Sequence, residues 1–334
     1  MRRCVTAIRV GILLAGAWAA AGCGDSGRAT DTATVDPRVP VAPPIERAEL
    51  KLKLRVGERF PLRKVVEQQI MQSLPEMAGQ PADSTVSRLE MLLGITVEAL
   101  DKTGTRLGVR YDRVRFTRNH RGETLEYDSD RPPVALPLEL AAYQGMVGRG
   151  FSFWLGAENR IARVAGFAAF VQAALAKVPP ESRQDVLLGV EAGTGDDGVV
   201  DFVDDTLGLL PFDGTKAAGD TWRHTQRMAR PVPMHIDTLC TLRDLTPELA
   251  VIDVRGDVTP MVSSGVRTVA HEALHVVVER GRTVGECTLF RDTGLPKESK
   301  IVQEIDLAIR APGRPVLQQH KRVTTTIESF PTAE

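Results

Sequence analysis

The sequence has 334 residues, a formal net charge of −1 and 43% hydrophobic residues, which is enough for one large folded domain or two small ones. Its basic residues are scattered, and this excludes the clustered basic surface typical of nucleic-acid-binding proteins. Only 5% of the residues are aromatic, which argues against a groove that stacks bases or sugars.

The first residues predict an export signal. Arg2, Arg3 and Arg9 come before an apolar run over residues 10–21, and this run closes on small residues. A positive segment, a short apolar run and small residues before a cleavage site make a signal peptide. The run is too short and too rich in Gly and Ala for a membrane-spanning helix, which needs about 20 apolar residues. We therefore expect residues 1–22 to be removed on export.

A candidate lipidation site, Cys23, follows directly after Ala20-Ala21-Gly22. This segment resembles the lipobox of bacterial lipoproteins, in which the cysteine is acylated and becomes the new N-terminus. The resemblance implies a membrane-anchored lipoprotein of the bacterial cell envelope that faces the periplasm or the exterior. Ala20 stands where Leu is usual, so the alternative is ordinary cleavage after residues 19–21, which would leave a soluble secreted protein.

A tether and one folded domain are expected after Cys23. Residues 24–44 are rich in Gly, Ser, Thr, Asp and Pro and contain almost no bulky apolar side chain. Such a segment cannot bury enough surface to become ordered. The sequence therefore predicts a disordered tether over 23–44 and a single domain over 45–330.

Short alternating segments dominate this domain and predict a meander of hairpins, which forms an antiparallel sheet. The hairpins recur in a matching order, which suggests an internal duplication, and chance similarity among short hairpins is the alternative. The expected hairpins cover 94–116 with a turn at 101–104, 151–164 with a turn at 156–159, 236–254 with a turn near Pro247, and 287–309 with a turn at 292–294.

The middle of the domain has helical spacing. Three helices are expected, over 166–178, 181–190 and 197–209, because apolar side chains recur there every three or four residues. Helices between two β halves are expected to pack on one face of the sheet. We predict an α+β fold with a two-part, mostly antiparallel, half-barrel-like sheet. Its parts are a first β half over 45–165, a helical insert over 166–210 and a second β half over 211–330.

Five short motifs are spread over the domain: Leu54-Arg-Val-Gly57, Asp112-Arg-Val114, Tyr127-Asp-Ser129, Leu210-Pro211 leading to Gly219-Asp-Thr-Trp222, and Asp292-Thr-Gly-Leu-Pro296. Together they resemble the bacterial envelope lipoproteins known only as a domain of unknown function, DUF6263. That family has no agreed activity, so the resemblance implies an envelope lipoprotein and no particular chemistry. Its build is similar to the half-barrel of lipoprotein carriers of the LolA/LolB type, an analogy at the level of fold only.

One motif could hold zinc. His271-Glu272-Ala-Leu-His275 has the His-Glu-x-x-His spacing, which on a helix puts two imidazoles on one metal ion and a glutamate on the attacking water. A third protein ligand is not evident, and Glu298 or Glu304 would have to supply it. The β-branched flanks favour a strand instead. A zinc metallohydrolase is therefore an alternative function, and no metal or other cofactor is favoured.

Two further features bear on function. Cys240 and Cys287 are a candidate disulfide in an oxidising compartment. Phe151, Phe153, Trp154, Phe167 and Phe170 are candidates for an apolar groove, or for a solid core. We expect a non-enzymatic, lipid-anchored envelope protein that binds an apolar ligand or a partner protein and no nucleic acid. A structural envelope component with a filled core and no ligand is a further alternative.

Overall fold

The computed structural model describes residues 46–74, 83–102, 104–156, 159–184, 186, 207–211, 213–228, 232–261, 265–269 and 272–330. Residues 45–334 form one compact unit. The predicted signal peptide, lipidated Cys23 and tether lie outside the described residues.

The first half of this unit is a meander of long strands followed by short helical turns. The long strands agree with the expected hairpin around Gly104, and they extend well beyond its predicted ends. The elements are β1 (Arg47–Ala48), β2 (Arg59–Ser73), β3 (Asp83–Asp101), β4 (Gly104–His120), β5 (Glu123–Asp128), η2 (Leu138–Leu140), α1 (Ala141–Met146), β6 (Gly150–Leu155), β7 (Ile161–Ala165), α2 (Phe167–Ala174) and η4 (Pro180–Ser182).

The second half is a second meander. The predicted hairpins around Pro247 and Asp292 are both present in it, again with longer strands. The elements are η5 (Leu207–Leu209), β8 (Lys216–Ala217), β9 (Thr221–Met228), β10 (Met234–Leu245), β11 (Leu249–Pro260), β12 (Gly265–Val269), β13 (Glu272–Phe290), β14 (Pro296–Arg310) and β15 (Leu317–Ser329).

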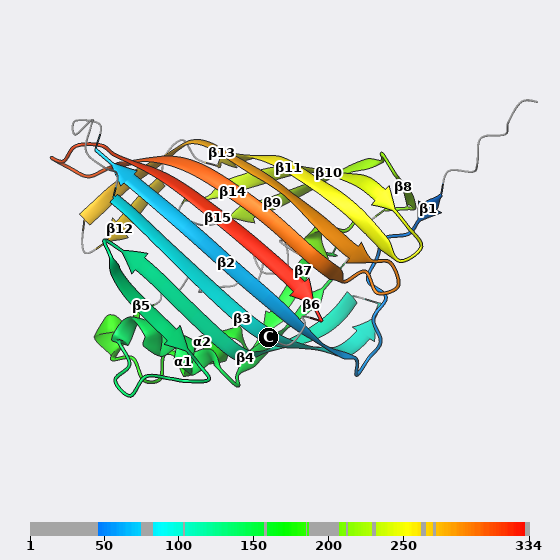
Figure 1. The fold of residues 1–334 in the computed structure, drawn as a ribbon, viewed down its shortest axis with the longest axis horizontal. Helices are drawn as coiled ribbons and strands as arrows, with labels where there is room; N and C mark the ends of the chain where they lie inside the picture. The colour runs from blue at the N-terminus through cyan, green and yellow to red at the C-terminus, as the bar shows by residue number, and fades with distance from the viewer. Residues whose placement is uncertain are drawn as a thin grey trace, which may run out of the picture. The chain divides into compact units, whose positions relative to one another are not determined.

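Thirteen of the described strands, from both halves, form one antiparallel sheet (Figure 1), and β1 and β8 pair with each other in a separate two-stranded sheet. The path across the 13-stranded sheet is β7-β6-β4-β3-β2-β15-β14-β13-β11-β10-β9, with β5 added to β4 and β12 added to β13. The last strand, β15, pairs with the first long strand, β2, and so joins the halves. Among the described strands, β7 and β9 do not pair with each other, so the sheet does not close. The prediction of a mostly antiparallel sheet is confirmed.

Alternation along the strands separates an apolar face from a charged one. On β3 the side chains at every second position are buried, because they face the main core cluster. Two of the positions between them carry charged residues on the opposite face, where Arg88 bridges Glu67 on β2 and Glu90 on β3. The buried residues of β3 are Ser87, Leu89, Met91, Leu93, Ile95 and Val97.

The helices that the structure describes are few and short. Helix α2 begins at Phe167 as expected but ends at Ala174, four residues before the predicted end. Most of the other two predicted helices lies outside the described residues. Helix α1 was not predicted, and it lies with α2 beside β4 and β5 (Figure 1). None of the helices that the structure describes has the length and apolar character needed to span a bilayer.

Candidate functional site

A tight turn sets the geometry of the β4–β5 hairpin. Arg121 and Gly122 connect the strands with φ values of 51° and 83°, as in a two-residue type I′ turn. Glycine adopts this conformation readily, whereas arginine does so at a cost. Arg121 Nε and Nη2 donate to Oδ1 and Oδ2 of Asp83 on β3, at 3.2 and 2.7 Å, and these hydrogen bonds anchor the turn.

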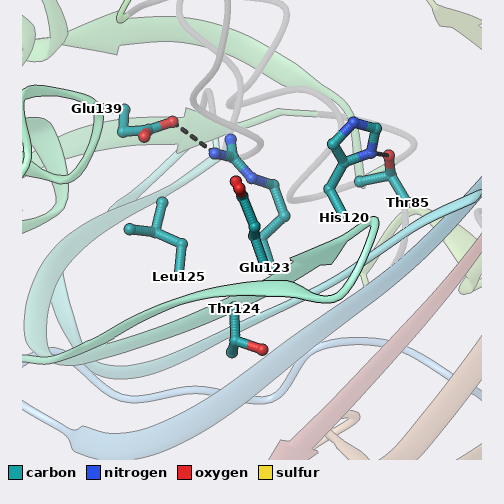
Figure 2. Close-up of a pocket in the computed structure, with 7 residues that line it drawn as sticks. Thr85, His120, Glu123, Thr124, Leu125 and Glu139 are labelled. Carbon is teal, nitrogen blue, oxygen red and sulfur yellow. Dashed lines mark hydrogen bonds and ion pairs between the residues drawn. The ribbon is translucent and has the colours of Figure 1, made fainter.

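Polarity changes steadily along one face of this hairpin. The cross-strand pairs on that face run from Phe116 and Tyr127 through Arg118 and Leu125 to His120 and Glu123. The first pair is buried, Leu125 is half-buried and Glu123 is exposed. Glu123 and Leu125 point to the same side of β5, and Thr124 points to the other (Figure 2). One surface therefore grades from apolar to charged over three residue pairs.

Two adjoining cavities follow this gradient. We call them together the amphipathic groove; they have volumes of about 420 and 390 Å³, in the range of small-molecule sites. Arg118, Leu125 and Glu139 line both. The polar cavity is also lined by Thr85, His120, Glu123 and Thr124, and the apolar cavity by Phe116, Leu138, Leu140, Tyr143, Ser182 and Val186.

The opposite wall comes from η2 and α1. Tyr143 of α1 is 1% exposed, and its ring stacks on Phe116 with centroids 4.9 Å apart. At the boundary of the two cavities, Arg118 Nη2 donates to Glu139 Oε2 at 2.7 Å. At the polar end, Thr85 Oγ1 and His120 Nδ1 form a hydrogen bond of 2.8 Å (Figure 2). Stacking and hydrogen bonds thus fix the side chains around the groove.

The base of the hairpin is held by two of the short motifs. Arg113 donates two hydrogen bonds to the carboxylate of Asp128, at 3.2 and 2.8 Å, on the face opposite the groove. The Val114 amide donates to Ser129 Oγ at 3.1 Å, and the Ser129 amide donates to the Val114 carbonyl at 3.0 Å. The motifs Asp112-Arg-Val114 and Tyr127-Asp-Ser129 therefore form one clasp.

This clasp predicts a defined acid sensitivity. The hydrogen bonds from Arg113 lower the pKa of Asp128 from 3.8 to about 2. The ionised carboxylate therefore stabilises the folded state above about pH 4, and that stabilisation is lost as the pH falls towards about 2. We expect the free energy of unfolding, measured in urea, to fall less steeply over this window in Asp128→Asn than in the parent. Exposed Glu126→Gln is the control, and superimposable profiles for Asp128→Asn and the parent would contradict the clasp.

Comparison with known proteins identifies the family. The sequence model of DUF6263, a family of unknown function, matches residues 102–296, more than half of the chain. The chain belongs to this family. The match covers every residue of the groove except Thr85. No curated protein matches the chain.

A search of solved structures also gave matches at low identity. Lipovitellin aligns at 12% identity and a TM-score of 0.44 over 84% of this chain, which spans only 26% of the lipovitellin chain. Pseudomonas aeruginosa OpdQ (6% identity, TM-score 0.19) covers 83% of this chain and 100% of its own. Acinetobacter baumannii OccAB4 aligns at 8% identity and a TM-score of 0.18, and the alignment covers 83% of this chain and 99% of the OccAB4 chain. At these TM-scores none of them supports an inference about ligand or activity.

The aromatic residues predicted to line a groove do not form one in this DUF6263 member. Phe151, Phe153, Phe167 and Phe170 are all at most 9% exposed, and three of them pack ring against ring. Trp154 lies on the other side of β6, because side chains alternate along a strand. There its ring centroid lies 3.6 Å from the Arg163 guanidinium carbon and 4.6 Å from the Arg106 guanidinium carbon. The phenylalanines are core, and the groove lies elsewhere.

The described part of the candidate zinc motif is a strand. Glu272 and His275 lie on β13, as the β-branched flanks indicate, and His271 lies outside the described residues. A His-Glu-x-x-His site requires a helix to bring both histidines to one metal ion. Among the described residues, no group of three or more His, Cys, Asp and Glu side chains is arranged to hold a metal ion. The geometry gives no support to the hydrolase alternative.

The candidate disulfide is not formed in this structure. Cys240 and Cys287 are buried free thiols on β10 and β13, and β11 pairs with both of these strands. Strands two places apart are separated by about 10 Å, and a disulfide requires Cα atoms within about 7 Å. The sequence separation allowed a bridge, but the strand order prevents it.

Both thiols are expected to be unreactive in the folded protein. Each is 0% exposed, and burial raises the pKa of each to about 12, so the reactive thiolate is scarce at neutral pH. An alkylating reagent at about pH 8 should leave both unmodified until urea is added. After urea, without reductant, both should react fully, as read by mass spectrometry of the two cysteine peptides. A requirement for reductant would reveal a bridge.

Proposed function

We propose that the chain is an exported, lipid-anchored envelope protein of non-enzymatic type that holds an amphipathic ligand in the amphipathic groove. The observation that carries the proposal is the polarity gradient from Phe116 to Glu123 along two adjoining cavities. A ligand with an apolar chain and a polar head would bury its chain against Leu125 and Tyr143 and keep its head near His120. Burial of the chain supplies affinity, and the polar end fixes the orientation.

Direct binding tests the ligand part of this proposal. Three decyl ligands with a cationic, a neutral and an anionic head are titrated as monomers into the Cys23→Ser chain by calorimetry. At least one should bind at one molecule per chain, with the negative heat-capacity change that apolar burial produces. No binding by any of the three would leave the structural-component alternative.

Labelling in cells tests the anchor. The sequence before Cys23 supports acylation, and each methylene of an acyl chain buried in a bilayer adds about 0.8 kcal/mol of membrane affinity. Labelled palmitate should be incorporated into the parent chain and absent from Cys23→Ser. Equal labelling of both would remove the anchor from the proposal and leave the groove unaffected.

We also infer that the two meanders descend from one duplicated unit. The path β2-β3-β4-β6-β7 and the path β9-β10-β11-β13-β14 run in the same direction across the sheet. Each half also adds one short strand, β5 or β12, to a longer one. Superposition of the two meanders in a crystal structure should align their inward-facing positions. Alignment only after one meander is reversed would contradict the duplication.

A further inference from the structure

The charges at the polar end of the groove specify the head of the ligand. We propose that the amphipathic groove selects an amphiphile whose head carries a positive charge, an inference that rests on the proposed function. The side chains with formal charge around the polar cavity are Arg118, Glu123 and Glu139, and His120 adds charge only when protonated. One arginine against two glutamates leaves one negative charge.

Arg118 is already neutralised. Its terminal nitrogen donates to Glu139 at 2.7 Å, so an anionic head would have to displace Glu139 and leave that carboxylate unpaired. Glu139 is half-exposed on η2, and η2 forms the wall opposite β4. An acidic head therefore exchanges one ion pair for another and adds a net negative charge to the groove. This exchange disfavours anionic ligands.

Glu123 is available to a cation. It lies on the groove side of β5, opposite His120, and its carboxylate points into the polar cavity (Figure 2). Among the residues that the structure describes, Glu123 has no cationic partner. The neighbouring Arg121 is paired with Asp83 at 2.7 Å. A positively charged head at this point gains an ion pair without breaking one.

The apolar end suits the remainder of such a ligand. Leu125 continues the same face of β5 inward from Glu123, and the stacked rings of Phe116 and Tyr143 follow beyond it. A linear chain attached to a head near Glu123 would therefore run over Leu125 towards those rings. The ligand class is a molecule with one cationic group and a single linear apolar chain.

The test compares head groups on a constant chain. Decyltrimethylammonium, decyl maltoside and decyl sulfate are titrated into the Cys23→Ser chain below their micelle concentrations. The cationic ligand should bind at least fivefold more tightly than the neutral one and tenfold more tightly than the anionic one. In Glu123→Gln, the affinity for the cationic ligand should exceed the affinity for the neutral ligand by about twofold or less. The affinity for the neutral ligand should be unchanged. Glu126→Gln makes the same substitution three positions later, on the other side of β5, and should leave all three affinities as in the parent.

The outcomes separate this inference from the proposed function. Binding of decyl sulfate as tightly as the cation, or an unchanged ratio in Glu123→Gln, would overturn the cationic preference while the groove remains a ligand site. No binding of any ligand would overturn both. A second arm distinguishes a free amphiphile from a membrane lipid of the same chemistry. If the protein removes a cationic single-chain lipid from phosphatidylcholine vesicles, the ligand can come from a membrane. If the protein binds only the monomeric amphiphile in solution, the ligand is a free amphiphile.

Discussion

The Leu125→Gln variant is expected to bind a decyl ligand about tenfold more weakly than the parent chain. Leu125 is the apolar side chain that lines both cavities, so the ligand chain must cross it. Full burial of a leucine contributes about 1.5–3 kcal/mol, and half-buried Leu125 would contribute about 1.4 kcal/mol to a ligand, which is a factor of ten in affinity. Calorimetric titration of both chains measures the difference.

A matched control separates this effect from a general loss of structure. Glu126→Gln introduces the same side chain one position later, where β5 faces away from the groove, and should leave affinity unchanged. Because Leu125 is half-buried, its replacement should cost about 1 kcal/mol of folding stability, too little to unfold the domain. Equal affinities for Leu125→Gln and the parent would show that the ligand binds elsewhere.

The Gly145→Ala variant is expected to lose about 2–4 kcal/mol of folding stability. Alanine normally stabilises a helix relative to glycine by about 0.5–1 kcal/mol, so the expected sign is the reverse of the usual one. The reason is the close approach of α1 and α2. A Cβ at Gly145 would lie 2.6 Å from Ala174 Cα, and closer still to the carbonyl oxygen of that residue. Backbone cannot move aside as a flexible side chain can.

The same substitution should weaken ligand binding. Helix α1 carries Tyr143 against Phe116, so pushing α1 away from α2 changes the apolar wall of the groove. Urea unfolding and calorimetric titration measure the two effects. Gln144→Ala, at the preceding position of α1, is the control and should keep both stability and affinity near those of the parent. A stabilised Gly145→Ala chain would show that the helices are farther apart than described.

Much of the sheet could be predicted because its strands alternate cleanly. The hairpin around Gly104 was predicted from apolar residues at every second position, and β3 and β4 pair through that turn. The length of the strands could not be predicted in this way. Their ends carry residues such as Thr85 and His120, whose polarity is typical of loops as well as of exposed strand ends.

The site was harder to predict than the sheet. The aromatic residues between Phe151 and Phe170 have the spacing of either a cavity lining or a core, and only packing shows that the phenylalanines fill space against one another. Strand β5 is not among the predicted hairpins, although it ends within the motif Tyr127-Asp-Ser129. A usable signal was present, because Gly122 separates the alternating residues Phe116 to His120 from Leu125 and Tyr127.

The groove itself has no local signature. Its two walls, β5 and the η2–α1 segment, lie ten or more residues apart in the chain and meet only because α1 packs against α2 and β4. The ion pair between Arg118 and Glu139 spans 21 residues for the same reason. Such contacts between separate elements depend on tertiary packing, which hydrophobic periodicity does not describe.

Photo-crosslinking tests most directly whether the amphipathic groove holds the apolar chain of a ligand. A decylammonium ligand with a diazirine at the end of its chain is irradiated with the Cys23→Ser chain, and the modified peptides are identified by mass spectrometry. The account predicts modification concentrated on β5 and α1, at Leu125 and Tyr143 and their groove neighbours, and competed by decyltrimethylammonium. Modification concentrated on the phenylalanine cluster around Phe167, or spread evenly over the surface, would contradict it.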